Sequence, residues 1–257
     1  TGFRVIKADG LSEGKGVVVA NSEREALEAA RDMLEKKIHG AAGSRIIIEE
    51  CLMGRECSIM ALCDGENSIL LPVARDYKRV QDGDHGPNTG GMGAYSPLSD
   101  IADALLAEIK TRIIDPTLQG MRERELTPYC GVLYAGIMLT ENGPQLLEYN
   151  VRFGDPETQV VLSRIHPDDF VEHMFACLTP GGLAQVQPLR LTAGAAVCVV
   201  LASGGYPQKY DTGHIITGLA QAKNCDVFHA GTEHKNAQLV TSGGRVMSVV
   251  GLGDSVR

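Results

Sequence analysis

The chain has 257 residues, of which 44% are hydrophobic and 22% charged, so it can bury one large core or two or three small ones. Its net charge of −8 argues against a broad nucleic-acid-binding surface, because neutralising phosphates requires clustered lysines and arginines. The longest apolar stretches, such as Ala193–Ala202, have the length of a strand and are too short to cross a membrane.

The seven cysteines include no C-x-x-C pair. We interpret them as small buried hydrophobic residues in a reducing compartment, because a structural zinc site needs closer pairing. Nothing at the N-terminus resembles a targeting segment. The cytosol is therefore the expected location.

The first part of the chain is predicted to alternate strands with one helix. Ser22-Glu23-Arg24-Glu25 is a capping box, and apolar residues follow it at helical spacing to about Lys37. Two later strands are expected to form a hairpin across Asp64-Gly65. The predicted strands are 3–8, 17–20, 45–50, 57–62 and 68–73.

Residues 75–97 show no periodic pattern but contain much Gly, Asp and Pro, and they are predicted to form a loop. A loop this long inside a compact protein is usually functional or disordered. The run Gly90-Gly91-Met92-Gly93-Ala94 beside Tyr95 favours an ordered backbone feature.

The second half of the chain continues the mixture of helices and strands. Helices are predicted at 101–121 and 168–178, and a hairpin at 132–139 and 144–150. From Leu189 onward, short strands alternate with glycine turns, which indicates a small β-rich domain. The fold class is therefore α/β (α+β).

A glycine-rich segment between the first two strands is a candidate polyphosphate site. Glycines let the backbone bring N–H groups close to phosphate oxygens, and lysines neutralise the charge. The segment is not a Walker A loop, because a strand follows it. The alternative is a plain hairpin turn with solvated lysines. The candidate residues are Lys7, Gly10, Gly14, Lys15 and Gly16.

A second candidate nucleotide segment begins at the end of the third strand. The backbone near Glu49, Glu50 and Leu52 could meet an adenine edge, and Glu56 could accept ribose hydroxyls. By itself this pattern is weak, because carboxylates at a strand end are more often solvated.

Glu148-x-Asn150 is the strongest local signal. The two-residue period of a strand places both side chains on one face, where their oxygens suit Mg²⁺ (or Mn²⁺) bridging ATP phosphates. Arg152 is predicted to continue that face and to bind a carboxylate or phosphate. A polar strand face with a surface ion pair would be the simpler interpretation of Glu-x-Asn alone.

The loop at 87–97 is a candidate substrate site. Its glycines are expected to expose backbone N–H groups, and cations precede them, so the loop could hold a substrate phosphate or an acyl phosphate. An ordered surface Ω-loop is the alternative. The candidate substrate residues here are Asp76, Gly90, Gly91, Met92 and Gly93, with Lys78 nearby as a catalytic candidate.

Taken together, these motifs closely resemble the glycinamide ribonucleotide synthetase family of the ATP-grasp superfamily. The resemblance spans nearly the whole chain, and PNTGGMGAYSP and RFGDPETQ are its most specific motifs. It rests on residues 7–17, 49–56, 87–97, 134–136, 152–159, 203–207, 216–218, 228–232 and 243–246.

The resemblance implies an ATP-grasp fold, in which two subdomains sandwich ATP and a small β-rich domain follows. It gives a nucleotide-binding subdomain at 1–56, a catalytic subdomain at 57–187 and a C-terminal domain at 188–257. It also implies that the chain is a fragment, lacking the family's N-terminal domain and its C-terminal end. The full protein is then expected to be active, and the fragment weakened or inactive.

The resemblance also implies a reaction in de novo purine biosynthesis. Glycine, ATP and 5-phosphoribosylamine would give glycinamide ribonucleotide, ADP and phosphate through glycyl phosphate. Arg152, Asp155 and Lys78 would be catalytic, and Arg152 and Gly154 would also contact substrate. The metal would rest on Glu148 and Asn150, because the preceding strand, residues 136–139, lacks the second carboxylate that related enzymes often carry.

Two alternatives remain. One is another ATP-grasp carboxylate–amine ligase or a carboxylase, against which the PNTGGMGAY loop argues. The other is a non-catalytic nucleotide-binding module, in which Glu148, Asn150 or Arg152 should have been lost. In every case the expected partners are small molecules, with neither nucleic acid nor membrane.

Overall fold

The computed structural model describes residues 4–12, 16–83, 85–124 and 127–256. The chain divides into two compact units, Thr1–Gly54 and Arg55–Arg257. Gly14 and Lys15, two of the expected nucleotide-binding residues, lie outside the described residues.

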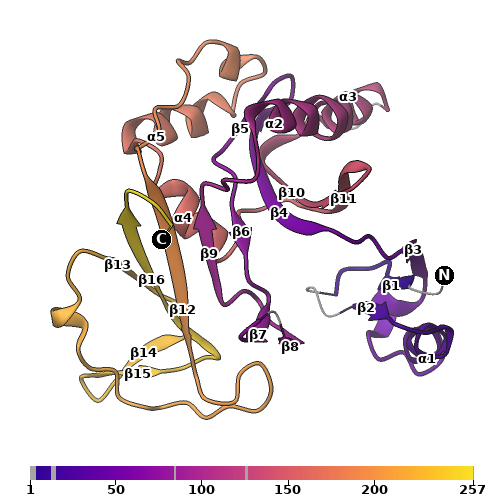
Figure 1. Ribbon diagram of the computed structural model, residues 1–257, viewed down its shortest axis with the longest axis vertical. Coiled ribbons are helices and arrows are strands. Elements are labelled where there is room, and N and C mark those ends of the chain that lie inside the picture. The colour runs from indigo at the N-terminus through magenta and orange to yellow at the C-terminus, as the bar shows by residue number, and fades with distance from the viewer. Residues whose placement is uncertain (1–3, 13–15, 84, 125–126, 257) are drawn as a thin grey trace. The chain divides into compact units, whose positions relative to one another are not determined.

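The first unit is a three-stranded antiparallel sheet with one helix on one face (Figure 1). The strand order is β2 (Val17–Ala20), β1 (Arg4–Ala8), β3 (Ile46–Glu50). Helix α1 (Glu23–Leu34) packs Ala29 and Met33 onto Ile6, and these three side chains are the core of the unit.

The N-terminus of α1 confirms the predicted cap. The Ser22 hydroxyl accepts a hydrogen bond from the Glu25 N–H at 3.2 Å, and the Glu25 carboxylate accepts one from the Asn21 N–H at 2.6 Å. The helix ends at Leu34, before the predicted Lys37. Lys37 itself has a left-handed backbone (φ 53°), which cannot continue a right-handed helix.

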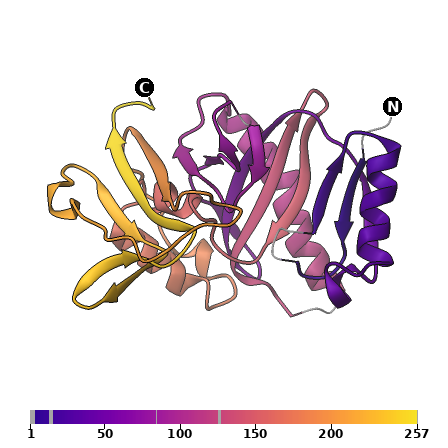
Figure 2. The same ribbon diagram turned by 90° about the horizontal axis from the view of Figure 1, so that it is seen from below.

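The second unit is built on a four-stranded antiparallel sheet in the order β11 (Gly143–Asn150), β10 (Cys130–Thr140), β4 (Arg55–Asp64), β5 (Ser68–Leu70). One face packs against α2 (Asp103–Ile109), a π-helical turn (Lys110–Ile114) and α3 (Asp115–Glu123). The other packs against α4 (Glu157–Leu162) and α5 (Pro167–Ala176) (Figures 1 and 2). Because both faces are covered, β4 is buried from Cys57 to Asp64.

A five-stranded sheet occupies the rest of this unit, in the order β13 (Asp226–His229), β16 (Arg245–Gly253), β12 (Ala195–Ala202), β9 (Gly93–Ser96), β6 (Arg75–Asp76). It joins the C-terminal strands to two strands from the first half of the chain. The predicted division at 187/188 stays a prediction, and this sheet joins residues on both sides of it. A separate hairpin pairs β14 (Thr232–Lys235) with β15 (Gln238–Thr241).

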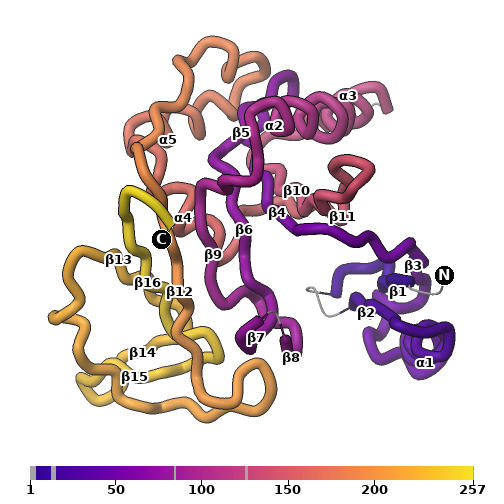
Figure 3. Tube along the Cα trace, viewed as in Figure 1, coloured from indigo at the N-terminus to yellow at the C-terminus, as the bar shows by residue number. Residues whose placement is uncertain are grey.

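The prediction of a loop at 75–97 was wrong, because this segment contains β6, β7 (Arg79–Gln81), β8 (His85–Asn88) and β9. Figure 3 follows the chain through these strands to β9, which pairs with β12. Strands of two to four residues are too short to display an alternating pattern. In addition, Gly93 leaves the space that pairing needs, since a Cβ there would lie 2.6 Å from the Cys198 carbonyl oxygen.

The prediction that the cysteines are buried holds for four of the seven and is wrong for Cys130, which is exposed, while Cys51 and Cys225 are half-buried. Cys57, Cys63, Cys177 and Cys198 are buried, and all seven cysteines are free thiols. Burial raises the pKa of Cys57 and Cys63 to about 12 and that of Cys177 and Cys198 to about 11, so these four are poor nucleophiles. In the described parts of the chain, no helix combines the length and apolar character needed to span a membrane.

Candidate functional site

The sheet of the first unit has an open face opposite α1. Strand register places Val17 and Ile47 beside Lys7, and Val19 and Glu49 beside Val5. Val17, Val19 and Ile47 are between 38% and 48% exposed, which is unusual for three aliphatic side chains on one small sheet. The Lys7 ammonium pairs with the Glu49 carboxylate at 2.7 Å. This face therefore combines an apolar surface with one cation.

The glycines at the edge of this sheet serve packing. The Gly10 N–H donates to the Ala42 carbonyl at 3.0 Å, and a Cβ at Gly10 would lie 2.6 Å from the Ala42 Cα. A Cβ at Gly16 would lie 2.7 Å from the Ser12 Cβ. The expectation that the Gly10 N–H is open to a phosphate was therefore wrong. Glu50 is exposed and Leu52 is half-buried, and their roles toward a nucleotide stay predictions.

In the second unit, strand register gathers polar side chains on one face of the central sheet. Glu148 lies opposite Gly136, which lies opposite Ser58, and Asn150 lies opposite Tyr134. Glu56, two residues before Ser58, shares this face. The prediction that Glu148 and Asn150 lie on the same face is therefore confirmed.

Glu148 and Asn150 fit a divalent cation. Within the described ranges, neither the Glu148 carboxylate nor the Asn150 amide has a protein hydrogen bond or ion pair, and Glu148 is exposed. Their oxygens are hard ligands of the kind that Mg²⁺ and Mn²⁺ accept. Gly136 across the ladder adds no third ligand, and no cluster of three His, Cys, Asp or Glu occurs among the described residues. Phosphate oxygens and water could supply further ligands.

The prediction that Arg152 continues the face of β11 was wrong. The strand ends at Asn150, and Arg152 lies two residues beyond it in a bend. Its guanidinium donates to the Phe153 carbonyl at 2.8 Å and has no carboxylate partner among the described residues. The side chain is exposed, so it remains available to bind an anion.

Lys78 lies among carboxylates beside the same face. Its ammonium is 2.6 Å from a Glu56 oxygen and 3.4 Å from an Asp76 oxygen. Burial raises the pKa of Asp76 to about 6, helped by Glu157 and Glu56 and opposed by Lys78. Burial alone would lower the pKa of Lys78, but Asp76 and Glu56 outweigh it and raise that pKa, so the ammonium stays charged at neutral pH.

A buried hydrogen-bond network borders this cluster. The Tyr134 hydroxyl donates to the Glu157 carboxylate at 2.6 Å, the Ser58 hydroxyl donates to the same oxygen at 3.0 Å, and the two hydroxyls lie 2.7 Å apart. All three side chains are at most 6% exposed. A Cβ at Gly154 would lie 2.6 Å from a Glu157 oxygen, so Gly154 makes room for this carboxylate. Burial, and then Glu157, raise the pKa of Tyr134 far above its ordinary value.

Sequence reasoning assigned this network no role. Glu157 is the last residue of the RFGDPE motif, and Tyr134 belongs to the segment 134–136 on which the family resemblance partly rests, but neither was predicted as a site residue. The available signal was the placement of a hydroxyl at Ser58 and another at Tyr134 in strands that are otherwise apolar. Buried hydroxyls in such strands need partners, and a carboxylate can accept from two of them.

The glycine loop does not expose its N–H groups, contrary to the prediction. The Gly90 N–H donates to the Tyr206 hydroxyl at 3.0 Å, the Gly91 N–H to the Thr89 hydroxyl at 3.0 Å and the Met92 N–H to the Tyr77 carbonyl at 2.7 Å. The three N–H groups are therefore already satisfied within the protein. Any contact with a substrate must use other atoms of the loop.

Asp155, an expected catalytic residue, has its carboxylate engaged by protein groups. One oxygen is 2.9 Å from the Arg245 guanidinium, and the other accepts from the Gln159 amide at 2.9 Å. Arg245 is in β16, about 90 residues away along the chain, and was not predicted as a site residue. Its contacts give Asp155 a structural partner, and the catalytic role of Asp155 stays a prediction.

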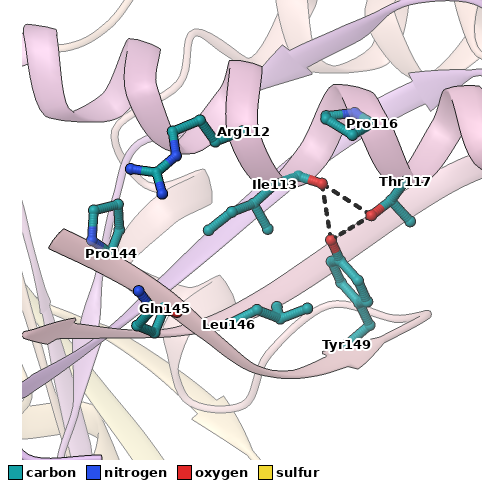
Figure 4. A pocket seen from close by; sticks show the side chains of 8 residues that line it. All are labelled: Arg112, Ile113, Pro116, Thr117, Pro144, Gln145, Leu146 and Tyr149. Atoms are coloured by element: carbon teal, nitrogen blue, oxygen red, sulfur yellow. Dashed lines mark hydrogen bonds between the residues drawn. The ribbon is translucent and has the colours of Figure 1, made fainter. Parts of the chain in front are cut away.

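A cavity of about 360 Å³ lies on the opposite side of β11. Its wall includes Tyr149, whose hydroxyl is 2.6 Å from that of Thr117 and donates to the Ile113 carbonyl at 3.0 Å (Figure 4). None of the predicted site residues lines this cavity. Tyr149 alternates with Glu148 and Asn150 along the strand, so the cavity and the polar face are on opposite sides of the sheet.

Comparison with solved structures and family models identifies the fold. The biotin carboxylase of Campylobacter jejuni superposes with a TM-score of 0.68 at 14% identity, over 99% of this chain and 54% of that chain. At this identity the likeness concerns the fold alone. Residues 1–158 match a family model of an ATP-grasp domain, so the fold is the ATP-grasp fold, as the resemblance of the motifs implied.

The chain belongs to the phosphoribosylglycinamide synthetase family. Residues 1–158 match the model of its ATP-grasp (A) domain, and residues 196–257 match that of its C domain. The crystal structure of phosphoribosylamine–glycine ligase from Thermotoga maritima has a TM-score of 0.87 at 40% identity and covers 98% of this chain and 62% of that chain.

Curated relatives agree with this assignment. The phosphoribosylamine–glycine ligase of Rhodopirellula baltica is 49% identical over 98% of this chain. The human trifunctional purine biosynthetic protein adenosine-3 is 47% identical over 98% of the chain. The chain spans 58% of the length of the first relative and 25% of the second.

Proposed function

We propose that this chain carries the ATP-dependent half of a phosphoribosylamine–glycine ligase. The complete reaction would join glycine to 5-phosphoribosylamine in purine biosynthesis, giving glycinamide ribonucleotide, ADP and phosphate. The observation that carries the proposal concerns one face of the central sheet. This face presents the Glu148 and Asn150 oxygens, which have no protein partner within the described ranges, together with Glu56, whose carboxylate pairs with Lys78. Family membership and the names of the relatives support the choice of substrates.

In this proposal Glu148 and Asn150 hold the divalent cation, Mg²⁺ or Mn²⁺. When bound, that ion neutralises charge on the ATP phosphates during transfer. Lys78 adds a permanent positive charge beside it, because Asp76 and Glu56 keep its ammonium protonated. Phosphoryl transfer depends mainly on such positioning and neutralisation, so no protein nucleophile is needed.

Glycine is a zwitterion, and the site offers both charges that it needs. The exposed Arg152 guanidinium can hold the glycine carboxylate or the acyl phosphate, with two donors in one plane. Asp76 is ionised above about pH 6 and can accept hydrogen bonds from the glycine ammonium. Attack of a carboxylate oxygen on the γ-phosphorus would form glycyl phosphate and release ADP. The sugar amine would then displace phosphate from the acyl carbon.

In the same proposal, residues of the first unit are candidates to contact the nucleotide base and one of its phosphates. The open face of this unit offers Val17, Val19 and Ile47 to a flat aromatic base, and Lys7 to a phosphate. Glu49, Glu50 and Leu52 follow on β3 and just beyond it. Glu56 remains the candidate for the ribose hydroxyls through the oxygen that Lys78 does not bind.

A different ATP-grasp ligase or a carboxylase is the second candidate function, and it shares the fold with the biotin carboxylase. Against it stands the 49% identity to a phosphoribosylamine–glycine ligase across nearly the whole chain. A non-catalytic module is disfavoured because Glu148, Asn150, Arg152 and Lys78 are all retained. A cytosolic location, and partners limited to small molecules, belong to the same proposal.

The test is ADP release by a protein of full family length that contains this chain. We expect release to require both glycine and 5-phosphoribosylamine, together with a divalent cation. Glutamate or bicarbonate in place of glycine should give less than about 1% of the rate, because a site shaped for glycine lacks space for the larger acid and lacks the ammonium contacts for bicarbonate. Equal rates with either replacement would overturn the proposal.

A further inference from the structure

Arg245 at the start of β16 connects two segments that are far apart in the sequence. Its guanidinium donates to the Gly90 carbonyl at 2.9 Å and to the Asp155 carbonyl at 2.9 Å, and it also donates to the Asp155 carboxylate at 2.9 Å. A longer contact of 3.4 Å reaches the Gly91 carbonyl. One side chain of the C-terminal sheet therefore binds both specific motifs of the chain.

The glycines of the loop are explained by this contact. A Cβ at Gly90 would lie 3.0 Å from the Arg245 Cζ, and a Cβ at Gly91 would lie 2.4 Å from the Pro156 Cδ. Gly91 also has a φ of +115°, a backbone conformation that residues with a side chain rarely adopt. The Gly90-Gly91 pair therefore lets the guanidinium and the Asp155-Pro156 turn approach the loop closely.

Each of the two segments is linked to a charged residue of the candidate site, one to Lys78 and the other to Glu157. On one side, the Thr89 N–H and hydroxyl both donate to the Lys78 carbonyl, at 2.7 and 2.8 Å. On the other side, Glu157 follows Asp155 by two residues and binds Tyr134. The position of Arg245 therefore fixes the backbone that carries Lys78 relative to the backbone that carries Glu157.

We infer that Arg245 is a positioning residue for the amino-acid substrate, acting from the C-terminal sheet through the Gly90-Gly91 and Asp155-Pro156 turns. This inference rests on the proposed function for the identity of the substrate. In this role Asp155 holds the Arg245 guanidinium in place by accepting its hydrogen bonds. Arginine is required here because its planar fork reaches several acceptors at once, whereas a lysine ammonium is a single point charge.

The test compares Arg245→Lys with Arg190→Lys in a protein of full family length. Arg190 forms a similar multiple contact with Asp169, and among the described residues its guanidinium bonds only Asp169 and His166 and neither motif, so it is a matched control. For Arg245→Lys we expect the KM for glycine to rise about tenfold, since small displacements of positioning groups cost one to two orders of magnitude, while the KM for ATP changes less than twofold. Arg190→Lys should change neither value.

Hydrogen exchange supplies a readout that does not depend on the substrate. Arg245→Lys should speed exchange at the Gly90 and Gly91 amides and at 154–157, and Arg190→Lys should leave both segments as in the wild type. Asp155→Asn should reproduce the effect, and adding Arg245→Lys to it should change little more.

The two proposals can fail separately. If the wild type does not use glycine but Arg245→Lys still loosens both turns, the proposed function fails and the positioning role stands. If exchange is unchanged in Arg245→Lys, or if the KM values for ATP and glycine rise together, the positioning role is overturned. The lysine variant keeps the positive charge beside Asp155, so it is expected to fold where a neutral substitution of Arg245 would leave that carboxylate unpaired.

Discussion

The two sheets that carry the candidate site residues differ in the exposure and polarity of the faces proposed to bind ligands. In the first unit, one face is covered by α1 and the other leaves Val17, Val19 and Ile47 between 38% and 48% exposed. In the second unit, both faces of the central sheet are covered, and Ser58 and Tyr134 share a buried carboxylate. The first face is apolar and accessible; the second is polar, with Ser58, Tyr134 and Glu157 buried and Glu148 exposed.

This difference predicts that single substitutions affect ligand binding and turnover differently in the two units. Contact between aliphatic side chains and a flat base is spread over several residues, and each contributes a modest share. A charged side chain that holds a metal ion or an anion contributes individually, and removing a member of the group formed by Lys78, Asp76 and Glu56 leaves its partners unpaired. Substitutions in the second unit should therefore have large effects on turnover, and those on the open face of the first unit small ones.

The largest effect is expected for Glu148→Ala. We predict that turnover falls by at least about 10³-fold at saturating Mg²⁺, since one of two protein ligands is lost and phosphate charge is no longer neutralised. Steady-state ADP release as a function of metal concentration measures this. Glu141→Ala, in the exposed turn of the same hairpin, is the control and should be normal. Near-normal turnover in Glu148→Ala would show that Glu148 is not a metal ligand.

Arg152→Lys should have the next largest effect, about a 100-fold loss of kcat/KM for glycine, because a bidentate fork becomes a point charge. Kinetics with glycine as the varied substrate would detect this loss. Arg24→Lys, on an exposed face of α1, should leave the kinetics unchanged. An unaltered kcat and KM for glycine would remove Arg152 from the substrate site.

The pH dependence of stability should reveal the buried carboxyl of Asp76. Its pKa rises from the ordinary 3.8 to about 6 in the folded state, so the folded state binds more protons between these values. Wild-type stability should then fall, relative to Asp76→Asn, as pH rises from about 4 to 6, by up to about 3 kcal/mol. Urea unfolding at several pH values from 5 to 7.5 would show part of this change.

Asp100 provides the contrast for that measurement. Burial would raise its pKa, but its bonds to Arg75 outweigh burial and lower it, so its titration lies below 3.8. Asp100→Asn should therefore lower stability by the same amount at every pH from 5 to 7.5. If the Asp76→Asn difference were equally flat, the raised pKa of Asp76 would be wrong.

The smallest effect is expected on the open face of the first unit. Val19→Ala should raise the KM for ATP about threefold, and should change the free energy of unfolding by less than about 1 kcal/mol, because this side chain is already half exposed. On the covered face, Ile6→Ala should destabilise by about 2–5 kcal/mol. A large loss of stability in Val19→Ala would mean that this face is not open.

Much of the local structure followed from the sequence, because its causes are local. The cap at Ser22, the hairpin that carries Glu148 and the shared face of Glu148 and Asn150 depend on neighbours in the chain. The end of β11 before Arg152 was missed because no residue pattern marks where a strand leaves its partner.

The missed features are those that depend on distant segments. Strand β9 is defined by pairing with β12, about 100 residues later, and has almost no apolar pattern of its own. Gly90 and Gly91 suggested open N–H groups, but Tyr206, Thr89 and Arg245 occupy or surround them. Glycine in such a motif is compatible with ligand approach and with close protein packing, and the sequence alone does not distinguish the two.

In the proposed function, the full-length protein activates glycine by phosphoryl transfer to its carboxylate. Glycine labelled with ¹⁸O in the carboxylate tests it directly, in a protein of full family length with ATP, Mg²⁺ and 5-phosphoribosylamine. Attack on the γ-phosphorus, followed by displacement by the amine, transfers one labelled oxygen from glycine to the released phosphate. We predict phosphate carrying one ¹⁸O per turnover. Phosphate free of label, formed together with the amide product, would contradict the account.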